Sequence, residues 1–232
     1  MSTHLFREMQ YLRKQILSQG TLVEEAIRKS IRSFHDTNAE LGREVIEGDN
    51  DIDRAEIEIE EECLKILALH QPVASDLRFI VCCLKMNNDM ERMGDLAVSI
   101  ARRAVYLSKR PPVARPEEFH AMGEAVMNMV KHSMDALINA DDHLAEEICR
   151  ADDEVDAMKR RIQNEVRATI ELDPVQTRVY LKILSVPRHL ERIADLATNI
   201  AEDVIYLTRG DIARHRNLVE AAITDATEES HH

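Results

Sequence analysis

Hydrophobic residues recur every three to four positions along most of this 232-residue chain. That period is the signature of one buried face of an α-helix, whereas a half-buried strand alternates every two residues. Polar residues, glycine or proline interrupt the periodic stretches. We expect Pro187 to kink the last helix locally, because proline removes a helical hydrogen bond. The pattern predicts six helices, at about residues 3–34, 39–69, 73–107, 117–139, 141–171 and 174–208.

The third and sixth predicted helices carry an internal repeat. Residues 84–107 and 184–207 share ten identities in 24 positions, at an offset of 100. Such self-similarity indicates a duplicated structural unit. The segment 108–116 holds three of the six prolines and no periodicity, so it predicts a linker. The sequence therefore predicts an all-α protein of two tandem, pseudo-symmetric three-helix bundles. The two repeats are residues 1–107 and 117–210. Residues 211–232 are predicted to be a C-terminal extension that frays at its end.

Composition narrows the class of protein further. The chain has no Trp, four Phe, four Tyr and only six Gly, which argues against a β-sandwich or barrel. The net charge of −13 disfavours binding to a nucleic-acid backbone. We find no apolar run long enough for membrane insertion and no signal-peptide pattern. None of the four cysteines forms a Cys-x-x-Cys pair, so we expect reduced core thiols in a cytoplasmic protein.

Four pairs of acidic residues stand out, because each pair is spaced i, i+4 and so shares one helix face. Each pair follows the inward stripe of its helix by one residue. Each half has two such pairs, on adjacent helices and at the same position relative to the core. We therefore expect the two pairs of a half to meet along a surface groove. The pairs are Asp49 and Asp53, Glu91 and Asp95, Asp152 and Asp156, and Glu191 and Asp195.

Converging carboxylates repel one another, and a multivalent cation removes that cost. Oxygen ligands without Cys or His favour the hard ions Mg²⁺, Mn²⁺, Ca²⁺ or ferric iron. The alternative is that the rows are solvated faces of an acidic protein. Ser99 and Asn199 extend the two rows by one more oxygen-bearing side chain. Arg92 and Arg192 follow the glutamates, where they form either salt bridges along the helix or an outer clamp on the carboxylates.

A catalytic set is not recognisable in the sequence. It contains no Gly-rich phosphate loop, no nucleophile elbow, and no Ser or Cys placed with a His and an acid. Glu117-x-x-His120 is half of a di-iron signature, but it has no partner copy, so we do not assign it a ligand role. We expect a non-enzymatic protein. The alternative is a metal-dependent hydrolase or oxidase on a helical, carboxylate-bridged scaffold.

With these motifs, the chain resembles the PhoU family of phosphate-specific transport accessory proteins. The resemblance covers about residues 1–210, with Asp-Leu-Arg at 76–78, ERMGDLAVSIA at 91–101 and ERIADLATNIA at 191–201. It implies binding of iron or zinc clusters through the four acidic pairs. It also implies negative control of phosphate-starvation signalling. The protein would act as an adaptor between the ATPase of a phosphate ABC transporter and a sensor histidine kinase. The resemblance further implies a homodimer. Ser99 departs from the asparagine expected there, whereas Asn199 keeps it.

Overall fold

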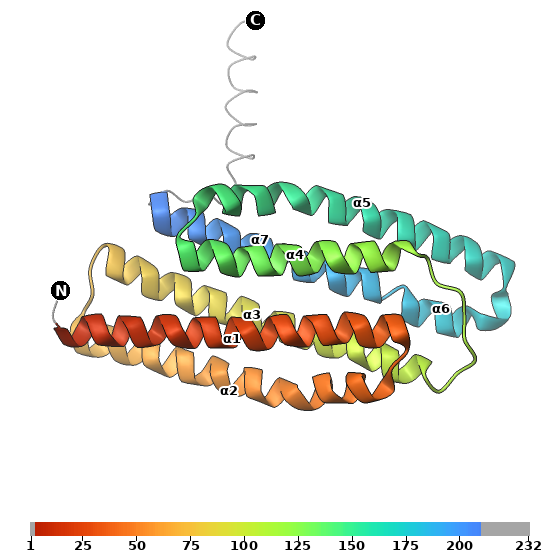
Figure 1. The fold of residues 1–232 in the computed structure, drawn as a ribbon, viewed down its shortest axis with the longest axis horizontal. Helices are drawn as coiled ribbons and strands as arrows, with labels where there is room; N and C mark the ends of the chain where they lie inside the picture. Colours follow the sequence, from red (N-terminus) through yellow and green to blue (C-terminus); the bar gives the residue numbers. More distant parts are fainter. Residues whose placement is uncertain (1–2, 210–232) are drawn as a thin grey trace, which may run out of the picture.

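The computed structural model describes residues 3–209, and these residues fold into long helices with short connections (Figure 1). The predicted extension 211–232 lies outside the described residues. The elements are α1 (Thr3–Asp36), α2 (Ala39–His70), α3 (Ser75–Leu107), α4 (Glu118–Asn139), α5 (Asp142–Leu172), the 3₁₀ turn η1 (Pro174–Gln176), α6 (Thr177–Ile183) and α7 (Val186–Arg209).

The turns that open α2 and α5 are built in the same way, at an offset of 103 residues. Thr37 and Ala140 adopt left-handed conformations, with φ of 53° and 51°. The next residues, Asn38 and Asp141, each accept two backbone N–H groups of the following helix. A side-chain oxygen at this position satisfies donors that the first helical turn leaves free. The same local chemistry therefore starts the second helix of each half.

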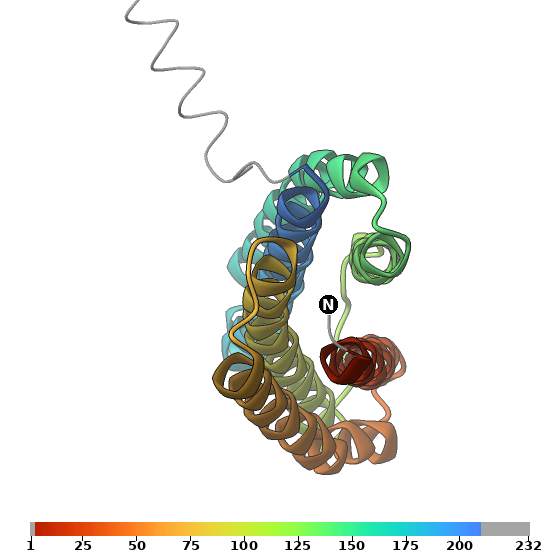
Figure 2. The same cartoon turned by 90° about the vertical axis from the view of Figure 1, so that its left-hand side faces the viewer.

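The helices form two three-helix bundles that lie side by side. One bundle contains α1, α2 and α3, and the other contains α4, α5 and α7 with the short α6. The bundles meet where α3 packs on α7 and α1 on α4, and Figure 2 shows these two contacts, with α2 and α5 at the outer ends. The all-α class and the tandem three-helix arrangement predicted from the sequence are thereby confirmed.

The region around Pro187 differs from the expectation of one locally kinked helix. One helix ends at Ile183 and a new one begins at Val186, so the helix is interrupted rather than kinked. Pro187 has no N–H to donate to the carbonyl of Ile183, and it fits best in the first turn of a helix, where no such bond is needed. The break frees Ser185 Oγ to accept a hydrogen bond from Arg103 Nε on α3 at 2.9 Å.

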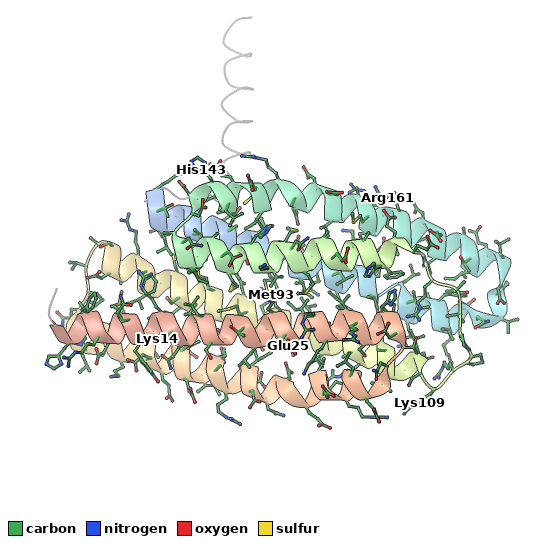
Figure 3. The ribbon with its side chains drawn as sticks, viewed as in Figure 1. Lys14, Glu25, Met93, Lys109, His143 and Arg161 are labelled. Carbon is green, nitrogen blue, oxygen red and sulfur yellow. The ribbon has the colours of Figure 1, made fainter. Side chains whose placement is uncertain are left out.

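Small residues line the centre of the core. Ala97 and Ala101 on α3 and Ala197 and Ala201 on α7 are completely buried, so the helices approach closely there. Charged side chains such as Lys14, Lys109, His143 and Arg161 project from the outside, whereas Met93 is buried (Figure 3). The side chains of Cys63, Cys82 and Cys83 are buried. Among residues 3–209, every helix is too short or too polar to cross a membrane.

Candidate metal centres

The acidic pairs of the first half lie on the facing sides of α2 and α3. A Cβ atom on Gly94 would lie 3.3 Å from Asp49 Oδ1, so the Asp49 carboxylate rests directly over the backbone of α3. Glu91 is half-buried beside it, and Asp53 and Asp95 are exposed at the rim. The absence of a side chain at Gly94 is what allows this close approach.

The carboxylates of this first groove repel one another. Burial, followed by the charges of Asp53 and Asp95, raises the pKa of Asp49 to about 6. Burial also raises the pKa of Glu91, with additional contributions from Asp95 and Glu56. Within the part of the chain that the structure describes, none of these five carboxylates forms an ion pair with a basic side chain. The charge of Arg102 lowers the pKa of Asp49 in part, but the first groove still carries an excess of negative charge.

The second groove, between α5 and α7, contains its own cation. Lys159 Nζ donates to Asp156 Oδ1 at 2.7 Å and to Glu191 Oε1 at 2.8 Å, and so joins the two helices. Burial lowers the pKa of Lys159, but the hydrogen bonds to the two carboxylates outweigh it and the net shift is upward. Burial, followed by the charges of Asp195 and Asp156, raises the pKa of Asp152 to about 6.

Glu56 and Lys159 occupy equivalent positions in the two halves, three residues after Asp53 and Asp156 respectively. The first groove thus has a fifth carboxylate where the second has an ammonium group. The acidic spacing alone did not reveal this difference, although an alignment of α2 with α5 at an offset of 103 would have shown it. At this position the two grooves differ by two units of charge.

Neither groove gathers its oxygens into a ready coordination sphere. Over residues 3–209, no group of three or more His, Cys, Asp or Glu side chains is arranged to hold a metal ion. The acidic rows face each other, yet a cation would require the side chains to rotate toward it. The donor chemistry, all oxygen and strongly negative, fits a hard cation in the first groove better than in the second. The ligand assignment stays a prediction.

The residues expected to form an outer shell line a pocket of about 590 Å³ where α3 crosses α7, and Asp95 and Asp195 line it as well. Arg92 Nη1 lies 3.9 Å from Asp89 Oδ1, an ion pair along the helix rather than a clamp on the acidic row. Burial lowers the pKa of His189 in this pocket, and the nearby charges of Arg103 and Arg192 lower it further. The repeat did not reveal His189, because its counterpart is Asp89. The predicted residues that line the pocket are Arg92, Ser99, Arg192 and Asn199.

Two copies of one three-helix bundle, each with a carboxylate-lined groove, define an all-helical tandem-repeat protein. The model of the PhoU domain matches residues 16–104 and 119–204. The chain belongs to the PhoU family.

Relatives in this family match along nearly the whole chain. A protein of Aquifex aeolicus described as a phosphate-specific transport system accessory protein PhoU homolog is 39% identical, over 93% of this chain and 98% of its own length. A Pseudomonas aeruginosa protein of the same description is 38% identical, over 91% and 88%.

Two crystal structures share the fold. PhoU from Pseudomonas aeruginosa has a TM-score of 0.86 at 37% identity and covers 88% of this chain and 99% of that one. The phosphate transport system regulatory protein PhoU from Streptococcus pneumoniae has a TM-score of 0.82 at 28% identity and covers 90% of this chain and 99% of that one.

Proposed function

We propose that this chain is a non-enzymatic accessory protein of phosphate transport. It acts in the cytoplasm as a negative regulator, and it links the ATPase of a phosphate ABC transporter to a sensor histidine kinase. The observation that carries this proposal is similarity over almost the full length to proteins described as phosphate-specific transport accessory proteins. The long, rigid helical surfaces suit a protein that contacts two partners, and we expect the regulator to be a homodimer.

The adaptor role is tested by recovery of partners from the native organism. The tagged full chain is purified from phosphate-replete and from phosphate-starved cells, and the proteins bound to it are identified by mass spectrometry. A transporter ATPase and a histidine kinase bound in replete cells support the proposal. Loss of the gene should also raise expression of phosphate-starvation genes in replete medium. The adaptor role would be refuted if neither partner were recovered and the expression of phosphate-starvation genes did not change.

We further propose that hard multivalent cations bind the two grooves, and that the first groove binds them more tightly. The supporting observations are five mutually repelling carboxylates without an ion pair in the first groove, against a resident Lys159 in the second. The first groove would use Asp49, Asp53, Glu91 and Asp95, and the second Asp152, Asp156, Glu191 and Asp195. Family resemblance adds iron and zinc to Mg²⁺, Mn²⁺ and Ca²⁺ as ions to test.

Elemental analysis of the untagged protein and thermal melts with each ion test this site. A ligand that binds only the folded state raises the melting temperature, by an amount that grows with the logarithm of its concentration relative to its Kd. Glu91→Gln should weaken stabilisation by metal, whereas Glu58→Gln on the exposed side of α2 should not. Equal stabilisation of both variants would favour the solvated-face interpretation. A phosphatase and oxidase screen of metal-loaded protein checks the non-enzymatic role, since turnover lost in Glu91→Ala would overturn it.

A further inference from the structure

The pocket at the α3–α7 junction is lined by basic and polar side chains from both bundles. Arg92, Ser99 and Arg102 come from α3, and His189, Arg192 and Asn199 come from α7. Its volume of about 590 Å³ is in the range of small-ligand sites. Three guanidinium groups and two carboxylates line it, so its lining has a small excess of positive charge on a chain whose net charge is −13.

Much of the hydrogen-bonding capacity of this pocket is unused. Both ring nitrogens of His189 are buried, and neither has a hydrogen-bond partner among residues 3–209. Arg102 and Arg192 make no hydrogen bond or ion pair with any residue in the range 3–209, although their charges act on Asp49 and Asp195 respectively. Buried polar atoms normally find partners, and a guanidinium presents five donors in a fixed fork. The pocket is therefore short of an acceptor-rich group that several of its donors could share.

Asp95 and Asp195 also line the pocket, and they limit what such a group can be. An anion with acceptors only, such as sulfate, satisfies the arginines but is repelled by the two carboxylates. Inorganic phosphate at neutral pH keeps a P–OH group, which can donate to a carboxylate while its other oxygens accept from the guanidinium forks. A phosphate monoester loses that proton above a pH of about 6.

We propose that this pocket binds inorganic hydrogen phosphate, held by Arg92, Arg102 and Arg192 and selected through its hydroxyl by Asp95 or Asp195. Because the lining comes from both bundles, the bound anion bridges α3 and α7 and stabilises their junction. This inference goes beyond the accessory role proposed above. It concerns the protein without bound metal, because Asp95 and Asp195 are also ligands in the metal proposal and line both sites.

The test uses the full chain in a chelating buffer at pH 8 and constant ionic strength, so that failure of the metal proposal does not affect it. Titration calorimetry and thermal melts compare inorganic phosphate, sulfate and glycerol phosphate. We expect saturable binding of inorganic phosphate, at least tenfold tighter than that of the other two anions. Saturable binding of glycerol phosphate with equal affinity would overturn the assignment to inorganic phosphate.

Variants separate a built site from general attraction of anions. Arg102→Gln and Arg192→Gln should each weaken phosphate binding at least tenfold. Arg167→Gln removes the same charge from the exposed side of α5 and should change it less than twofold. Asp195→Asn should narrow the preference for phosphate over sulfate. Should one arginine variant fold poorly, the other, checked by circular dichroism, decides the matter. Equal effects of all three arginine variants, or no saturable binding, would overturn the proposal.

Discussion

At the scale of single residues, Lys159 distinguishes the two halves most sharply. It is only 19% exposed and bridges Asp156 and Glu191, so it acts as a covalently attached counter-ion for the second groove. Glu56, at the equivalent position of the first groove, instead adds a negative charge and, together with burial, raises the pKa of Glu91. If the grooves bind cations as proposed, this one difference should make the first half depend more on cations from solution than the second.

Replacing Lys159 by Gln should make the second groove depend on metal. Without metal, the variant should lose about 1 kcal/mol of stability, because two partly buried carboxylates lose their charged partner. With added Mn²⁺ or Mg²⁺, its melting temperature should rise by more than that of the original chain. Lys131→Gln, an exposed position on α4, is the matched control. An equal metal-induced rise in all three proteins would contradict a counter-ion role for Lys159.

Asp49 gives a prediction for pH dependence in the metal-free protein. Its pKa is about 6 in the folded state against 3.8 ordinarily, so between these values the folded state holds more protons and stability falls as pH rises. Asp49→Asn lacks this penalty. Allowing for solvent screening, it should be about 1 kcal/mol more stable at pH 7.5, and the gain should vanish near pH 4. Chemical denaturation at both pH values measures this, with exposed Asp51→Asn as the control.

At the scale of helices, the stripe of buried alanines on α3 sets how closely its neighbours pack. Ala97→Leu adds three carbon atoms where no space is left and should destabilise the protein by about 1–3 kcal/mol. Ala68→Leu makes the same change on the exposed face of α2 and should cost little. Thermal melts of the two variants test this. Unchanged melting of Ala97→Leu would mean that the core seam is wrongly assigned.

The sequence predicted the features that depend on local spacing along the chain better than those that depend on contacts between distant residues. Long apolar periodicity specifies the helices, because burial of a stripe needs only local spacing. Whether Pro187 bends a helix or starts one depends on a tertiary partner, here the bond from Arg103 to Ser185. The acidic rows were found from their duplication. His189 and Arg102 were missed because their counterparts, Asp89 and Glu202, have different chemistry, so the repeat conceals them.

At the scale of the whole molecule, one ion pair ties the bundles together. Lys85 on α3 donates to Asp203 on α7, whose side chain is only 3% exposed. Removing the lysine leaves a buried carboxylate without this partner. Lys85→Met should therefore cost about 2 kcal/mol, and adding Asp203→Asn should recover part of the loss. A double-mutant cycle from denaturant melts measures the coupling, and a value near zero would mean that the pair does not join the bundles energetically.

The close likeness of the two halves carries a risk during folding. The α3 and α7 segments that meet within one chain share ten residues in 24, and only a short proline-rich segment connects their bundles. The first half of one molecule can therefore meet the second half of another through the surfaces that normally join halves of the same chain. Concentrated refolding should then yield domain-swapped dimers that separate slowly, a form of misassembly that duplicated proteins carry with their symmetry.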